Sequence, residues 1–129
     1  MIYEELMNRL VTTDPTFTEG KNAFLHRMPE ATKSGVLIMH HAGRPLNIDH
    51  ELGGIRRGQI MVVARGKTQL ESQALILKAV SALTVSGETL LGGYLIKQML
   101  PLTDPIIYPI SAGQFIEQAV SFNVVFCGV

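Results

Sequence analysis

The side chains of this 129-residue chain best suited to metal binding or general-base catalysis are its histidines. They are His26, His40, His41 and His50. A zinc site needs three or four converging ligands, but His40 and His41 are neighbours on an expected strand, where adjacent side chains point to opposite faces. His50 lies between two acidic residues, at a spacing that matches no known ligand motif. We therefore interpret the histidines as structural or surface residues and expect no metal site.

Nucleophilic chemistry lacks its usual supporting residues. Cys127 is the single cysteine and has no basic neighbour in the sequence that would activate its thiol. The pairs Gly53-Gly54 and Gly92-Gly93 do not lie between a strand and a helix start, where a phosphate-binding loop would be. We expect no catalytic residues, no cofactor and no enzymatic activity. A small enzyme that uses His40 or His41 as a general base is the weakest alternative.

Three arginines, Arg44, Arg56 and Arg57, bracket a segment that contains Pro45 and two glycines. This composition predicts a long loop over residues 44–58. A loop of this length in a small domain is more often functional than not. We interpret residues 44–57 as a mobile arm that contacts a neighbouring subunit. The alternative is a solvated loop whose charges pair with each other, which would contribute little stability.

Hydrophobic periodicity predicts the remaining elements. Two helices are expected, at residues 2–11 and 69–83, and Thr68 with Glu71 has the spacing of a capping box. The second helix has a wide apolar face that includes Leu70, Ala74 and Leu77. Strands are expected at residues 22–28, 36–41, 59–65, 89–100 and 115–127, with a bulge at Gly92-Gly93 in the fourth.

The resulting order is α-β-β-β-α-β-β, in a single domain over residues 1–129. We expect an α+β fold in which both helices pack on one face of a single mixed or antiparallel sheet. The first three strands are expected to form an antiparallel meander, because their connections are short.

Two of the expected strands are apolar on both faces. Met61 and Val63 lie opposite Ile60 and Val62, and Met39 lies on a strand with the same property. Charged residues make up 17% of the chain, against roughly 25% in average domains. A second cover from the proline-rich segment would explain this pattern, but we favour burial against other subunits. The predicted subunit-interface residues are Met39, Met61, Val63, Arg44, Arg56 and Arg57.

Eleven basic residues balance eleven acidic ones, which gives no electrostatic basis for binding nucleic acid or an anionic membrane. No apolar run approaches the roughly 18 residues of a membrane-spanning helix, and the first ten residues do not have the pattern of a signal peptide. The sequence therefore predicts a protein that folds in a cytoplasm and binds other proteins.

The C-terminal quarter carries a resemblance to a known family. It contains Pro105-Ile-Ile-Tyr-Pro109, a link of small residues, and a strand that reads Gln-Ala-Val-Ser-Phe-Asn-Val-Val-Phe over residues 118–126. With the short first helix, the strong second helix and the loop at residues 40–58, this pattern resembles the small tail-terminator or minor capsid proteins of tailed bacteriophages, relatives of the lambda tail terminator. One departure is Ile110-Ser111, where a basic residue would be expected after the Tyr-Pro turn.

The resemblance implies a structural protein of the virion. Such proteins form hexameric rings that cap the tail tube, stop its polymerisation and join it to the head–neck complex. The implied partners are copies of the chain itself, the tail tube protein and the head–tail connector proteins. The implied location is the neck of a virion assembled in the cytoplasm of a host bacterium. The alternatives are a head-side connector or stopper protein, and an oligomeric ferredoxin-like module that binds a small ligand.

Overall fold

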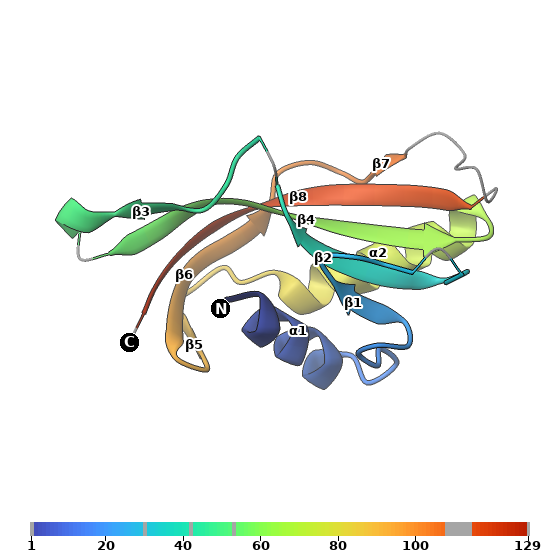
Figure 1. Ribbon diagram of the computed structural model, residues 1–129, viewed down its shortest axis with the longest axis horizontal. Coiled ribbons are helices and arrows are strands. Elements are labelled where there is room, and N and C mark those ends of the chain that lie inside the picture. Colours follow the sequence, from blue (N-terminus) through green and yellow to red (C-terminus); the bar gives the residue numbers. More distant parts are fainter. Residues whose placement is uncertain (1, 30, 42, 53, 108–114, 129) are drawn as a thin grey trace.

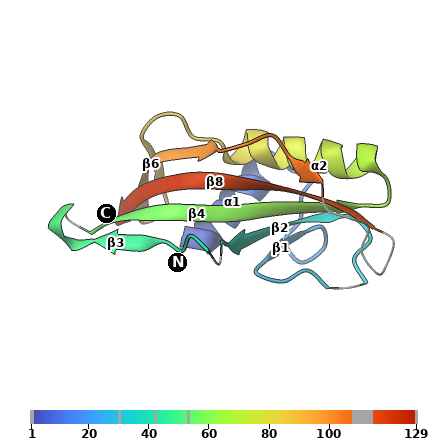
Figure 2. The ribbon, with the colours of Figure 1, turned by 90° about the horizontal axis from the view of Figure 1, so that it is seen from above.

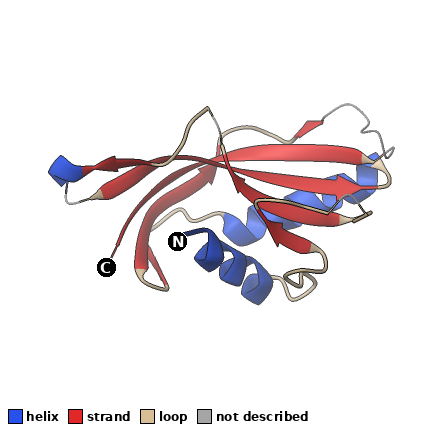
Figure 3. Ribbon diagram, in the orientation of Figure 1, coloured by secondary structure: helices blue, strands red, loops and turns tan. Residues whose placement is uncertain are grey.

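The computed structural model describes residues 2–29, 31–41, 43–52, 54–107 and 115–128. Within these residues, two helices and eight strands form an α+β fold with one mixed sheet (Figures 1 and 3), which confirms the predicted class. The helices are α1 (Ile2–Thr13) and α2 (Gln69–Leu83), and the short 3-10 helix η1 covers His50–Leu52. The strands are β1 (Ala23–Leu25), β2 (Gly35–His40), β3 (Asn47–Asp49), β4 (Ile55–Gly66), β5 (Thr89–Leu91), β6 (Tyr94–Pro101), β7 (Ile106–Ile107) and β8 (Ile116–Gly128).

The sheet has the order β1-β2-β4-β8-β6-β5, with β3 paired to β4 and β7 paired to β8. The two longest strands, β4 and β8, lie side by side in antiparallel register along most of their length. The expected antiparallel meander is wrong at its first strand, because β1 is parallel to β2. The physical reason is that β1 ends at Leu25, because the next residue, His26, has a positive φ of 64°. The connection then brings the chain back beside the start of β1 before β2 begins, so the two strands run in the same direction.

One hydrophobic core lies between the sheet and both helices (Figure 2). Ile60, Val62 and Ala64 of β4 are fully buried and point to this side. Leu6 of α1 and Ile76 of α2 are also fully buried in the same cluster. Burying a side chain of this size stabilises the fold by roughly 1.5–3 kcal/mol, so this face anchors both helices.

Helix α2 begins as its sequence predicts. The hydroxyl of Thr68 accepts a hydrogen bond from the backbone amide of Glu71 at 3.2 Å, and the Glu71 carboxylate accepts one from the amide of Lys67 at 3.2 Å. A capping box would return the glutamate to the amide of the capping residue itself, so this arrangement is shifted by one residue. Helix α2 packs on β4 and β8 and contacts α1.

Two segments differ from their predicted form. The expected bent strand at residues 89–100 is a hairpin of β5 and β6, because Gly92 adopts a φ of 60° and turns the chain there. The irregularity in β6 lies between Ile96 and Gln98, not at the glycines. The expected loop at residues 44–58 is largely regular, because β3, η1 and the start of β4 form a hairpin in which Asn47 pairs with Arg57.

Candidate interaction surfaces

The hairpin of β3 and the start of β4, here called the arm (residues 47–57), extends beyond the rest of the sheet at the left of Figure 1. Among the described residues, strand β3 pairs with β4 alone, which leaves its outer edge open. Ile48, in the middle of β3, is 48% exposed. The interpretation of this segment as an arm therefore has a structural counterpart, although a paired hairpin replaces the expected loop.

The predicted apolar interface residues lie together on the sheet face opposite both helices, here called the outer face. Met39 pairs in register with Met61, and Leu37 pairs with Val63. Met39 and Met61 are half-buried, whereas Val63 is 7% exposed. The structure thus brings three of the predicted residues into one patch. Two methionines suit an adaptable contact surface, because their side chains are flexible and polarisable.

The three predicted arginines do not form one cluster. Arg57 is exposed on the outer-face side of the arm, where it pairs with Asn47 of β3. Arg56 points to the opposite side, and its guanidinium lies 5.9 Å from the centre of the Phe126 ring. Arg44 is exposed in the link before the arm and is held by its backbone, because its carbonyl accepts a hydrogen bond from the Gln59 amide.

A fourth arginine, Arg65, was not predicted to be important but makes several polar contacts. It forms a salt bridge of 3.1 Å with Glu117 and donates to the carbonyls of Pro29 and Thr32 at 3.1 and 3.2 Å. These partners lie on β8 and on the link between β1 and β2, so the contact joins three segments of the chain. No local sequence signal indicates it, because its partners are between 33 and 52 residues away.

The histidines lie mainly at the surface. The rings of His26 and His40 are 6.4 Å apart, and His26 also contacts the Tyr3 ring edge-on at 4.8 Å. The ring of His41 accepts a hydrogen bond from the Gly43 amide at 3.2 Å. No group of three or more histidine, cysteine, aspartate or glutamate side chains within the described residues is arranged to hold a metal ion. Cys127 is a free, half-buried thiol on β8.

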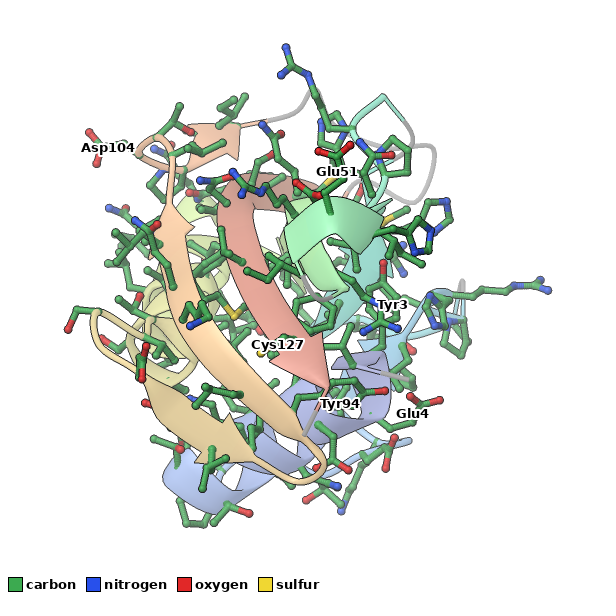
Figure 4. The ribbon with its side chains drawn as sticks, turned by 90° about the vertical axis from the view of Figure 1, so that its left-hand side faces the viewer. Tyr3, Glu4, Glu51, Tyr94, Asp104 and Cys127 are labelled. Atoms are coloured by element: carbon green, nitrogen blue, oxygen red, sulfur yellow. The ribbon has the colours of Figure 1, made fainter. Side chains whose placement is uncertain are left out.

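Between the arm and the start of α1 is an apolar cleft of about 220 Å³, here called the arm cleft. Its aromatic side includes Tyr94, whose ring meets that of Phe126 edge-on at 5.5 Å, and Figure 4 shows Tyr3 and Tyr94 near the end of β8. Burial raises the pKa of the Tyr3 hydroxyl above its ordinary value. The described residues that line the cleft are Ile2, Tyr3, Leu46, Ile48, Arg56, Tyr94 and Phe126, and among these Arg56 alone carries a charge.

A second apolar surface is the exposed side of α2, here called the α2 ridge (Leu70, Ala74 and Leu77). Leu70 is 79% exposed and Leu77 is 49% exposed, whereas the packed side of α2 consists of other residues, such as Ile76. The expectation that the ridge belongs to one wide packed face is therefore wrong. The sheet accommodates only the narrower side of the helix that carries Ser72, Ile76, Ala79, Ala82 and Leu83.

Grooves lie on both sides of the α2 ridge. A groove of about 500 Å³ separates it from the end of α1, where Asp14 lies. A hydrogen bond from the Thr16 hydroxyl, 2.6 Å long, holds the pKa of the Asp14 carboxyl below its ordinary value. A groove of about 320 Å³ on the other side contains Leu77, Asp104 and Ile107. The ridge, with the exposed Ile107 beside it, is thus a raised apolar surface that the described part of the chain leaves exposed.

No protein-family model matches this chain, and no curated protein sequence matches it. The fold, however, is similar to that of a solved structure described as "Virion of native gene transfer agent (GTA) particle". The two chains share 10% sequence identity with a TM-score of 0.62. The similarity covers 91% of this chain and 83% of the other. At this identity the shared feature is the fold.

Two sequence features stand outside what the fold can test. The Tyr-Pro turn at Tyr108-Pro109 and the Ile110-Ser111 departure lie outside the described residues.

Among the residues described, no helix has both the length and the apolar character needed to cross a membrane.

Proposed function

We propose that this chain is a structural protein of a phage-like virion, and that it acts as a tail terminator. In this role, copies of the chain form a hexameric ring that caps the tail tube, stops its growth and joins it to the head–neck complex. The observation that carries the proposal is the similarity of the fold, over 91% of the chain, to a component of a gene transfer agent particle. The sequence resemblance to tail terminators supports the same role independently.

The surfaces of the molecule support self-assembly. On the outer face, Met39 and Met61 are half-buried, and both helices lie on the other side of the sheet. The α2 ridge and the arm present further exposed apolar groups. A stable interface buries about 800 Å² per partner. Two such interfaces would take less than a quarter of the 7123 Å² of accessible surface, which a chain of this size can supply on two sides.

A ring requires contacts between two different surfaces of each copy, because a contact that pairs a surface with itself stops at a dimer. The arm is at the left end of the molecule in Figure 1, whereas α2 begins at the right. Different apolar groups at opposite ends are the arrangement that a head-to-tail contact needs. We propose that Met39, Met61 and Val63 on the outer face, and Arg44, Arg56 and Arg57 near the arm, contribute to subunit contacts.

Two observations together test this function. Electron microscopy of the purified protein should show closed rings, and particles assembled without the protein should carry tails of irregular, excessive length. A protein that sediments as a monomer at high concentration, combined with tails of normal length in its absence, would disprove the terminator role. Tails of normal length that are detached from filled heads would instead indicate a head-side stopper.

A further inference from the structure

The arm cleft and the α2 ridge are both apolar, one hollowed and the other raised. The cleft is concave and apolar, while the ridge presents Leu70, Ala74 and Leu77 at the i, i+4, i+7 spacing with which a helix docks into a groove. Within one molecule the two surfaces cannot meet, because the cleft lies at the arm end and α2 begins at the opposite end (Figure 1). They can meet only between two copies.

One pair of charges next to the two surfaces is complementary, although Lys78 also lies beside Leu77 in the groove toward α1. Of the described residues that line the cleft, Arg56 alone is charged. Asp104 is exposed and lies beside Leu77 in the groove next to the ridge. Figure 4 shows Asp104 at an edge of the molecule away from the labelled cleft residues Tyr3 and Tyr94. A cation in the concave surface and a carboxylate beside the convex one favour a single orientation when the surfaces meet.

We propose that the α2 ridge of one copy docks into the arm cleft of the next copy, and that an ion pair between Asp104 and Arg56 fixes their register. This inference rests on the proposed ring and deepens it, because it names the head-to-tail contact. Ile48 of the arm covers the docked Leu77 from one side, and the aromatic side of the cleft, with Tyr94, contacts it from the other. The arm is thereby the part of each subunit that reaches over its neighbour.

The test uses two variants that each damage one half of the contact. Leu77→Asp places a charge on the ridge and leaves the cleft intact, while Ile48→Asp does the reverse. Both side chains are about half exposed in the chain, so both variants should fold, which circular dichroism would verify. Each variant alone should lose rings and sediment as a monomer. The matched control Leu90→Asp changes a leucine that is 67% exposed on neither surface, and it should keep its rings.

Mixing the two variants gives the decisive result. The intact ridge of Ile48→Asp can dock into the intact cleft of Leu77→Asp, so the mixture should form one-to-one dimers that grow no further. Rings that persist in either single variant would overturn the docking proposal and leave the ring itself standing. A mixture that remains monomeric would also overturn it, because the one intact contact per pair should hold the two chains together.

Two further measurements are independent of the loss of apolar contact. In a Cys127→Ser background, Ile48→Cys with Leu77→Cys should form disulfides between copies that link whole rings, whereas Leu90→Cys in place of Leu77→Cys should not. Asp104→Arg and Arg56→Asp should each raise the dissociation constant of the ring about tenfold or more, which corresponds to the range of charge-pair effects at interfaces. Their combination should recover most of that loss. No recovery in a folded double variant would remove the ion pair from the proposal, and absence of the disulfide would remove the contact.

Discussion

Gly58 of β4 lies where the backbone of the link before the arm, at Pro45 and Leu46, crosses this strand. A Cβ atom at this position would lie 2.5 Å from the carbonyl oxygen of Pro45, which is closer than such atoms approach. We therefore predict that Gly58→Ala destabilises the protein by about 1–3 kcal/mol, because the link must move away from β4. The free energy of unfolding in urea measures the effect.

Gly87→Ala provides the matched control for this substitution. Nothing lies within 4 Å of the position where its Cβ would be, so its unfolding free energy should change little. Equal stability of the two alanine variants would show that the link at Pro45 can move from β4 without cost. The close approach would then have no structural role.

Residues that are near each other in sequence were predictable, and distant partners were not. The Thr68 cap follows from a spacing of three residues, and the amide–hydroxyl contact confirms it. The buried amide of Gln118 donates to the Ser72 hydroxyl at 3.0 Å, across 46 residues of sequence. A polar side chain in a core is stable only with such a partner, and the partner is decided by how α2 lies on β8. Sequence spacing contains no information of that kind.

At the scale of elements, the side chain of Thr68 caps the start of α2. Thr68→Ala removes the acceptor of the Glu71 amide, and we predict a loss of about 1 kcal/mol of stability, typical of a lost helix cap. Thr68→Ser retains the hydroxyl and should stay within a few tenths of a kcal/mol of the wild type. Thermal unfolding of the three proteins measures both differences. Equal losses in the alanine and serine variants would contradict the capping role.

The arm is the element expected to change most on assembly. Strand β3 has one neighbour in the sheet and an open outer edge, so its amides should exchange with solvent quickly in the free subunit. If the arm covers a neighbouring copy, exchange at residues 47–51 should slow by a large factor in rings. Hydrogen-exchange mass spectrometry of dilute and assembled protein tests this, with the central strand β4 at residues 60–64 protected in both states as a reference. Strong, equal protection of the arm in both states would contradict it.

Sequence periodicity located the long elements and failed on the short ones. Strand β8 and helix α2 are long enough for their pattern to be unambiguous, and both were placed to within about one residue. Strands β3 and β7 have three and two residues, too few to show a period. The glycine turn at Gly92 was interpreted as a bulge because a turn and a bulge both use glycine. Whether a turn or a bulge forms depends on which strand pairs with this segment, and the local sequence does not identify that strand.

At the scale of the whole molecule, the low charge and the surface apolar groups have one common explanation. The chain has 17% charged residues, yet Leu70 and the two isoleucines of β7 are more than half exposed. An isolated protein gains nothing from such exposure, whereas an assembly gains free energy when neighbouring copies cover these groups. The same argument predicted the outer face from sequence, because Met61 and Val63 are apolar where a one-sided sheet would be polar.

The outer face gives the prediction that tests this explanation most directly. Met61 is half-buried there, so Met61→Asp should fold, but in an assembly it would bury an unpaired carboxylate at a cost of several kcal/mol. We predict that closed rings are lost, by sedimentation and electron microscopy. Asn8→Asp adds the same charge at an exposed position of α1 and should leave the rings intact, and Met61→Leu should do so because it preserves volume and polarity. Rings of normal stability in Met61→Asp would exclude the outer face from the subunit interface. The head-to-tail contact between ridge and cleft would not depend on that result, because it uses the other side of the sheet.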